Sequence, residues 1–314
     1  MIKSPDNTTL YKGDVINNTY EVSFFIGQGA FGEVYRVKHK FFEESQVMKV
    51  FKEEYVENTD FNGIVNEGRI LSRLSHQNVV KVFEINTFSK NNKDYYFVTM
   101  NFISGESLTQ LVKRKMQLDV PVATSIMIDV LKGLTCAHNN NPTIIHRDIN
   151  PDNILLSYDN YKPLGVLGDF GIAKLLDQAK SLPGAGGRYL YFAPECFMNI
   201  YLPSSDVFSA GVVLYKILTG IHPWQYDFDH YTLDDNEDVS KMVNSGRREE
   251  PKKPSFFNKN IDERLNKVIL RSLEKNMENR YRTAGSFLKA LKNACEIRDL
   301  SNSYWLEQDL ISIN

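Results

Sequence analysis

The stretch that decides the fold is HRDINPDN, residues 146–153, which is followed directly by the apolar run Ile154–Leu156. It brings a histidine, an arginine, two aspartates and two asparagines together ahead of a run that is predicted to be a short strand. Two further triplets follow along the chain, DFG at 169–171 and APE at 193–195. This ordered set is the strongest chemical signal in the sequence.

A glycine-rich element lies far upstream of this block, where residues 27–32 read GQGAFG between two predicted strands. The Rossmann version of this pattern opens a helix, and a Walker loop ends in Gly-Lys-Ser/Thr, which is absent here. Glycines in a strand-turn-strand flap let bare backbone N–H groups approach phosphate oxygens. Alone the element is a weak signal, because a plain glycine turn has the same composition.

Lys49 lies in the predicted strand Gln46–Phe51, on the same face as Val47 and Phe51. A lysine that faces inward among apolar neighbours is costly unless it is paired. Glu67 is the obvious partner, because it interrupts the apolar stripe of a helix predicted over 61–74. Such a pair would leave the ammonium directed at phosphate. Without Glu67, an exposed edge-strand lysine would be the better interpretation.

The pattern of the whole chain changes near residue 100. Before it, five strands and one helix are predicted, and from Gly105 onward helical periodicity takes over. Pro121 begins one predicted helix, and Asp206–Leu218 is apolar nearly all round with Gly220 as a stop, which places it at the centre of a lobe. The predicted strands are Tyr20–Phe25, Glu33–Lys38, Gln46–Phe51, Val79–Ile85 and Tyr95–Met100.

Composition narrows the class of protein. The 314 residues carry 37 Lys plus Arg and 39 Asp plus Glu, so the net charge of -2 gives no reason to expect nucleic-acid binding. Cys136, Cys196 and Cys295 match no disulfide or metal spacing, which fits a reducing cytoplasm. The polar start Met1–Gly13 is unlike a signal peptide, and no apolar run approaches the roughly 18 residues of a membrane span. We expect a cytoplasmic protein without a membrane segment.

Neither the remaining charged stretches nor the histidines indicate a functional site. The acidic stretch Asp227–Asp238 and the mostly basic stretch Lys241–Lys253 are expected to form a solvated loop between helices. The six histidines lack metal-ligand spacing. His76 is expected to have a packing role.

In this order the motifs resemble the eukaryotic-like (Hanks) protein kinase family from about Asp14 to Cys295. The resemblance implies an α+β, bilobal protein kinase-like fold, with a small five-stranded antiparallel N-lobe that carries one helix and a larger, mainly helical C-lobe. The implied parts are a tail over 1–13, an N-lobe over 14–100, a C-lobe over 101–295 and a tail over 296–314. The run Gly220–Trp224 is more similar to bacterial members than to animal ones.

The resemblance also implies an ATP site. The glycine-rich loop would cover the ATP phosphates, and Lys49, held by Glu67, would contact the α- and β-phosphates. Met100 matches the gatekeeper, and the backbone of the hinge, residues 101–103, would bind the adenine edge. The predicted nucleotide-binding residues are Gly27, Gln28, Gly29, Gly32, Val34, Val47, Lys49, Met100, Asn101, Ile103 and Leu155.

The catalytic roles follow from the same resemblance. Asp148 would orient the substrate hydroxyl and accept its proton, while Asn153 and Asp169 would hold Mg²⁺. A structural ion pair is expected between Glu195 and Arg280. The stack that couples the lobes of active kinases is matched by Leu71, His146, Phe170 and Asp206.

Two positions depart from the serine/threonine pattern. The lysine usually found two residues after the catalytic aspartate is Asn150, and the usual Gly-Thr-Pro is replaced by Gly187-Arg188-Tyr189. Loss of a cation beside the transferring phosphoryl group would cost about 3 kcal/mol, roughly a hundredfold in rate. We therefore include Arg188 among the catalytic residues, on the hypothesis that it supplies the missing charge.

Specificity and regulation are less clearly marked. The arginine signatures of tyrosine kinases are absent, and the run from Asn150 to Asn153 favours Ser/Thr specificity. Arg147 would bind a phosphate at Ser181 if this serine were modified. Activity without such phosphorylation is slightly favoured, because glycines surround a segment with few acceptors.

We expect an ATP-dependent protein serine/threonine kinase with a protein substrate, autophosphorylation included. The first alternative is a pseudokinase that binds nucleotide as a scaffold or switch. Asn150 and Arg188 favour it, whereas the presence of Lys49, Asp148 and Asp169 opposes it. A small-molecule kinase is the second alternative, but such enzymes generally lack an APE segment.

Overall fold

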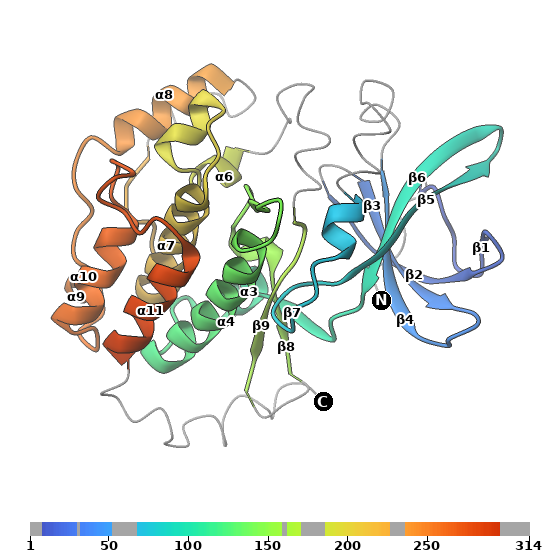
Figure 1. The fold of residues 1–314 in the computed structure, drawn as a ribbon, viewed down its shortest axis with the longest axis horizontal. Helices are drawn as coiled ribbons and strands as arrows, with labels where there is room; N and C mark the ends of the chain where they lie inside the picture. Colours follow the sequence, from blue (N-terminus) through green and yellow to red (C-terminus); the bar gives the residue numbers. More distant parts are fainter. Residues whose placement is uncertain are drawn as a thin grey trace. The chain divides into compact units, whose positions relative to one another are not determined.

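The computed structural model describes residues 8–29, 32–51, 68–158, 162–170, 186–226 and 236–295. The chain divides into two compact units, whose elements are labelled in Figure 1. Among the described residues, the first unit contains those up to His76 together with Val80–Ile103. The second contains Gln77–Val79, Ser104–Phe170 and the described residues after them.

A six-stranded antiparallel sheet forms the first unit, in the order β1-β2-β3-β4-β6-β5. Five strands were predicted, and the sixth is the two-residue β1, too short to show a pattern in the sequence. The strand predicted to begin at Val79 begins at Val82 and continues to Lys90. The strands are β1 (Val15–Ile16), β2 (Tyr20–Gly29), β3 (Gly32–His39), β4 (Ser45–Phe51), β5 (Val82–Lys90) and β6 (Lys93–Asn101).

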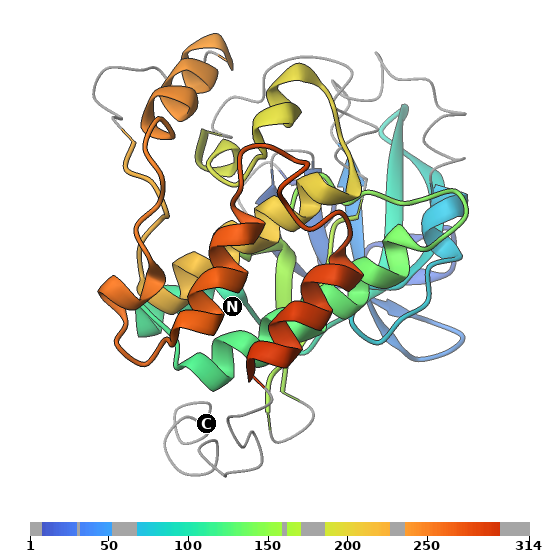
Figure 2. The ribbon, with the colours of Figure 1, turned by 60° about the vertical axis from the view of Figure 1, so that its left-hand side comes forward.

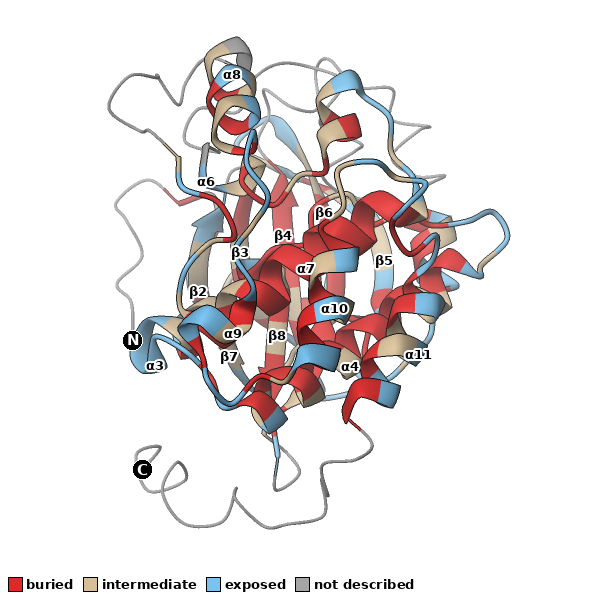
Figure 3. Cartoon of the chain, turned by 90° about the vertical axis from the view of Figure 1, so that its left-hand side faces the viewer, coloured by how far each residue is buried: buried red, intermediate tan, exposed pale blue. Residues whose placement is uncertain are grey.

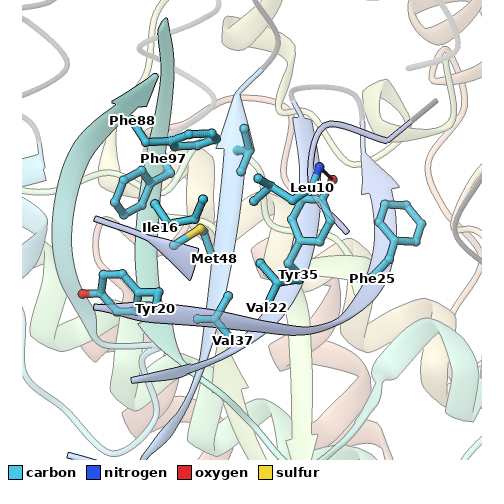
Figure 4. Packing of buried hydrophobic residues seen from close by; sticks show 11 residues of the cluster. Leu10, Ile16, Tyr20, Val22, Phe25, Tyr35, Val37, Met48, Phe88 and Phe97 are labelled. Atoms are coloured by element: carbon cyan, nitrogen blue, oxygen red, sulfur yellow. Dashed lines mark hydrogen bonds between the residues drawn. The ribbon is translucent and has the colours of Figure 1, made fainter. Parts of the chain in front are cut away.

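One face of this sheet carries an apolar cluster, drawn in Figure 4. Tyr35 pairs with Met48, and because opposite residues of an antiparallel pair point to the same face, both enter the cluster. The cluster also receives Leu10 and Ile16 from the start of the chain. Residues 8–13, which the sequence had placed in a tail, therefore pack in the first unit.

Only the end of the predicted helix over 61–74 is described, as a helical stretch at 68–72. Leu71 and Leu74 are buried there. Glu67 lies outside the described residues, so the expected Lys49–Glu67 pair stays a prediction.

The second unit is mainly helical and includes a three-stranded sheet in the order β7-β8-β9. Helix α4 packs against α11, β9 and α7, and Figures 1 and 2 both show α11 alongside α4. The strands are β7 (Gly105–Ser107), β8 (Ile154–Ser157) and β9 (Leu164–Leu167). The helices are α3 (Leu108–Lys115), α4 (Val120–His138), η1 (Pro151–Asn153), α6 (Gly186–Tyr189), η2 (Pro194–Met198), α7 (Pro203–Thr219), α8 (Asn236–Gly246), α9 (Pro254–Phe257), α10 (Glu263–Ser272) and α11 (Ala284–Cys295).

Helix α7 lies at the centre of the second unit, as its apolar composition predicted, and it is buried along nearly its whole length (Figure 3). Gly220 ends it with φ 79°, in the left-handed region that glycine adopts without strain.

Helix α4 bears on the expectation that the chain has no membrane segment. Among the described helices, it is the one that is long and apolar enough to cross a membrane, by length and composition. Of its apolar 18-residue window, 61% is buried inside the fold. Its contacts with α7, α11 and β9 account for the apolar composition in the way expected of a core helix.

The pair expected between Glu195 and Arg280 is confirmed. Arg280 Nη1 lies 2.7 Å from Glu195 Oε1, and their side chains are 0% and 2% exposed. Arg280 also donates to the Ser204 carbonyl at 2.9 Å, so it joins η2 to the start of α7. Cys136, Cys196 and Cys295 form no disulfide.

Candidate active site

Most of the predicted nucleotide residues of the first unit share one face of its sheet, opposite to the apolar cluster. The register pairs Val34 with both Gly27 and Lys49, and Val47 with Met100. Because successive side chains alternate between faces, Tyr35 and Met48 point to the cluster while Val34 and Lys49 point away from it. Among the predicted residues, this face therefore combines the apolar side chains of Val34, Val47 and Met100 with Lys49.

Lys49 is strongly buried, at 5% exposure. A lysine side chain at this depth is costly to bury unless its polar end has hydrogen-bond or charge partners. The sequence prediction that Lys49 faces inward from its strand is in keeping with this burial.

The glycine-rich element is closely packed at one end and open at the other. A Cβ atom added to Gly32 would lie 2.0 Å from the Val50 carbonyl oxygen, so only glycine fits at this position. A Cβ at Gly27 would meet nothing within 4 Å. Ala30 and Phe31, between Gly29 and Gly32, lie outside the described residues.

Gln28 departs from the other predicted residues. Its register partner is Glu33, on the cluster face of the strands, and its side chain is exposed. Its predicted contact with phosphate therefore falls to its backbone.

The predicted hinge is fixed by side chains of the first unit. Asn101 accepts a hydrogen bond from Lys81 N at 2.6 Å and donates its own N–H to the Lys81 carbonyl at 3.0 Å. The Arg36 guanidinium lies 4.4 Å from the centre of the Phe102 ring. With Asn101 occupied in this way, its predicted adenine contact falls to its remaining backbone group, and Ile103 is half-buried beside it.

In the second unit, Asp206 fixes the backbone of the HRD segment. Its carboxylate accepts hydrogen bonds from His146 N at 2.8 Å and Arg147 N at 2.9 Å, and its Oδ2 lies 2.8 Å from His138 Nε2. Arg147 has φ 70°, a conformation that needs support from its surroundings in a residue other than glycine. The buried carboxylate of Asp206 provides that support.

His146 connects this segment to the DFG motif. Its Nε2 lies 2.8 Å from the Gly168 carbonyl oxygen, and its ring centre is 4.5 Å from that of Phe170. Asp169, between them, has φ 54°. His146 therefore links the HRD segment, which carries Asp148, to the DFG motif, which carries Asp169.

Asp148 receives four side-chain donors. Its Oδ1 accepts from Asn150 Nδ2 at 2.9 Å and Arg188 Nε at 3.0 Å. Its Oδ2 accepts from Asn153 Nδ2 at 2.7 Å and from Arg188 Nη2. Because an ionised carboxylate offers about four lone-pair positions, these donors occupy all of them.

The side-chain oxygens of Asn153 and Asp169 are suitable ligands for a magnesium ion. Asn153 uses its amide nitrogen on Asp148, which leaves its side-chain oxygen as a ligand. Asp169 supplies a carboxylate, and hard oxygen ligands are those that Mg²⁺ prefers. Leu155, the apolar residue predicted to contact adenine, lies in β8 and is half-buried.

Arg247, which the sequence did not single out, holds the segment just before the APE motif. Arg247 is 4% exposed and donates to the carbonyl oxygens of Leu190 at 2.7 Å and Phe192 at 2.6 Å. Its guanidinium also lies 5.0 Å from the centre of the Trp224 ring. The segment that carries Arg188 is thus anchored at its far end by a buried cation.

This finding corrects the solvated loop expected over Lys241–Lys253. Helix α8 covers its first part, and Arg247 directly after that helix is buried. A count of charges cannot show this burial. The nearby Trp224 and Tyr226 were the available signal, because aromatic faces accept guanidinium groups. Ser181 and most of Asp227–Asp238 lie outside the described residues.

The comparisons with known proteins agree with this geometry. The family model described as "Protein kinase domain" matches residues 20–292. The chain is 31% identical over 284 residues to a probable serine/threonine-protein kinase of Clostridium perfringens, covering 89% of this chain and 39% of that one. It is 28% identical over 279 residues to the serine/threonine-protein kinase PknH of Mycobacterium tuberculosis, covering 88% and 42%.

Solved structures show the same fold. The crystal structure of the Mycobacterium tuberculosis PknI kinase domain has a TM-score of 0.68 at 23% identity, covering 91% of this chain and 100% of that one. The chain spans only 39% and 42% of the lengths of the two curated relatives.

Proposed function

Because this chain belongs to the protein kinase family, we propose that it transfers the γ-phosphate of ATP to a serine or threonine hydroxyl of a protein, its own chain included. The observation that carries this proposal is the buried Asp148 carboxylate, bonded to Asn153 in a loop that Asp206 fixes. The relatives named as serine/threonine kinases support the choice of hydroxyl.

Residues of the first unit would bind the nucleotide. Backbone N–H groups of Gly27, Gly29 and Gly32 would bind phosphate oxygens, and Lys49 would add a positive charge. Val34 and Val47 would pack against the adenine ring. These roles use the face of the sheet that lacks the apolar cluster.

Residues of the second unit would perform the chemistry. The oxygen of the substrate hydroxyl would attack the γ-phosphorus while Asp148 accepts the hydroxyl proton. The bond between the γ-phosphorus and the bridging β-phosphate oxygen breaks, and ADP leaves. Asn153 and Asp169 would hold magnesium, which when bound supplies positive charge to the phosphate oxygens. The positions of these groups are set by Asp206 and His146.

Arg188 would replace the cation that Asn150 does not provide. The four donors on Asp148 leave no lone pair for a substrate hydroxyl, so one donor has to give way. Arg188 is partly exposed, at 25%, and is the donor best able to turn from the carboxylate to the transferring phosphoryl group. Its bidentate geometry suits both anions.

The pseudokinase alternative is favoured by the same contact. A carboxylate with all its lone pairs occupied would be an inactive base if Arg188 never left it. Nucleotide binding by the first unit would then serve a scaffold or switch.

One assay separates these functions. Purified protein is incubated with labelled ATP and magnesium, with and without a generic acceptor protein, beside an Asp148→Asn variant. We expect label on protein hydroxyls with the unchanged chain and at least a hundredfold less with the variant. Equal incorporation in both would exclude Asp148 as the base, and nucleotide binding without incorporation in either would indicate the pseudokinase.

A further inference from the structure

Residues 8–14, here called the N-terminal strap, lie against the apolar cluster of the first unit. Leu10 is 1% exposed and packs beside Tyr35, as Figure 4 shows. This segment has no strand structure of its own before β1. The backbone of Gly13 and Asp14 bonds to Val22 of β2, and side-chain contacts with the sheet set the place of the residues before them.

The first anchor of the strap is a buried pair on β3. Thr9 N donates to Glu33 Oε2 at 2.9 Å, and Leu10 N donates to the Tyr35 hydroxyl at 3.0 Å. The Tyr35 hydroxyl in turn donates to the same Glu33 oxygen. Burial, together with the bond to Glu33, raises the pKa of Tyr35, so its hydroxyl remains a donor at neutral pH.

The second anchor is on β5. Lys90 Nζ donates to the Thr9 carbonyl at 2.9 Å and to Asp14 Oδ2 at 2.7 Å, and it lies 5.1 Å from the centre of the Tyr11 ring. Since β3 and β5 are not neighbours in the sheet, the strap spans several strands. Thr9 takes part in both anchors, and Asp14 holds the other end of the strap on Lys90.

Glu33 connects the strap to the glycine-rich element. It directly follows Gly32, and it pairs with Gln28 of β2 and Val50 of β4. Gly32 itself fits against the Val50 carbonyl with no spare room. At 8% exposure, the Glu33 carboxylate would be costly without the donors that the strap and Tyr35 supply.

We propose that the N-terminal strap sets the position of the glycine-rich loop through Glu33, which makes Glu33 a positioning residue for ATP. The inference rests on the proposed function in one respect, that this loop binds the nucleotide phosphates. A strap that is out of place moves Glu33 and Gly32 together, and backbone N–H groups that bind phosphate lose their alignment. The chemistry at Asp148, in the other unit, is left unchanged.

The test uses the full chain with two variants and one control. Glu33→Gln weakens the carboxylate as an acceptor, and Thr9→Pro removes the N–H that is donated to it. Phe88→Leu is the control, because Phe88 is a buried member of the same cluster and its phenyl ring offers no hydrogen-bonding group to the strap. All are measured at a temperature where each is fully folded.

We expect Glu33→Gln and Thr9→Pro, here called the strap variants, to raise the Kd for magnesium-ATP and the KM for ATP about fivefold or more, with kcat changed less than twofold. Phe88→Leu should lower the Tm and leave the Kd within about twofold. Folded strap variants that bind ATP as tightly as the unchanged chain would overturn the inference.

Hydrogen exchange supplies a readout that does not depend on nucleotide binding. The amides of residues 24–36 should exchange about tenfold faster in both strap variants than in Phe88→Leu. Unchanged exchange there contradicts the inference. If the unchanged chain itself binds no ATP while exchange still responds, the proposed function fails and the coupling of strap to loop stands.

Discussion

Arg188 holds the Asp148 carboxylate with two of its nitrogens, Nε at 3.0 Å from Oδ1 and Nη2 at Oδ2. The two residues are 40 positions apart in the chain. Asp148 lies in the HRD segment and Arg188 in α6, just before the APE motif. A planar guanidinium on a carboxylate fixes both groups in orientation as well as position.

The first prediction concerns this pair. Arg188→Ala should lower kcat about a hundredfold, because a cation at the reacting groups is lost. This change corresponds to a rise of about 3 kcal/mol in the activation free energy. The KM for ATP should change little. Arg188→Lys should recover part of the rate, since it restores charge without the bidentate geometry.

Arg114→Ala is a matched control, because Arg114 also pairs with an acid of the second unit, Glu106 at 2.9 Å, but on the surface. Steady-state phosphoryl transfer measures all three variants. Transfer that survives Arg188→Ala at the unchanged rate removes the proposed role of Arg188.

The second prediction concerns Asp206. Asp206→Asn replaces one of the two carboxylate oxygens with an NH₂ group, which cannot accept a hydrogen bond from a backbone N–H. The backbone of His146 and Arg147 should therefore lose its fixed position. We expect kcat to fall at least about tenfold, and the free energy of unfolding to fall by about 2 to 4 kcal/mol. Activity assays and urea unfolding measure these effects.

Thr219→Val provides the comparison on the same helix. Thr219 is buried in α7 and bonds the Tyr215 carbonyl, but not the HRD segment. It should lower stability with little effect on kcat. If Asp206→Asn behaves in the same way, then Asp206 supports the fold alone.

Much of the first unit could be predicted from the sequence, because strands follow a period of two. Val34, Val47 and Lys49 alternate with residues of the cluster, and this alternation carries into the observed register. Helix α7 was equally clear, since a helix that is apolar on all sides has to be buried.

The remaining features depend on contacts distant in sequence. Leu10 and Glu33 are ordinary residues until the strap lies over β3, and no local pattern predicts that packing. Arg247 appears as one cation in a basic run, and only the fold reveals the carbonyl oxygens that it binds. Arg188 was selected by its unusual place in a motif, and its contact with Asp148 is now observed while its role stays a prediction.

The third prediction concerns Glu195 and acid stability. Burial of Glu195 raises the pKa of its carboxyl, but the bonds and charge of Arg280, with a bond from Ser205, outweigh burial and hold that pKa below its usual range. The ionised pair therefore stabilises the fold above about pH 4.5. This contribution is lost as pH falls through the lower pKa of the folded state.

Glu195→Gln should lower the free energy of unfolding at pH 7 by about 3 kcal/mol or more, because it leaves Arg280 buried without its charge partner. Below about pH 4.5 the difference from the unchanged chain should shrink. Urea unfolding at pH 7 and pH 4 measures both values. A difference that is the same at both pH values contradicts this account.

The fourth prediction concerns His222 in the second unit. Burial, together with the nearby charges of Lys216 and Arg247, lowers the pKa of His222 to about 3. Its Nδ1 is buried with no hydrogen-bond partner among the described residues. The ring instead makes an edge contact with Tyr191, at 5.0 Å between ring centres. The folded protein therefore holds this imidazole neutral.

The direction of the pH effect follows because the pKa of His222 is lower in the folded chain than in the unfolded chain. Above pH 6.5 the imidazole is neutral in both the folded and unfolded chain, so His222 has no effect on the pH dependence. Between pH 6.5 and about 3 the unfolded chain binds a proton that the folded chain does not, and stability falls.

His222→Phe keeps an aromatic ring beside Tyr191 and removes this titration. Between pH 7 and pH 5 the unchanged chain should lose about 2 kcal/mol more unfolding free energy than the variant, as measured by urea unfolding. Equal losses in the two proteins would mean that the imidazole takes up its proton in the folded state.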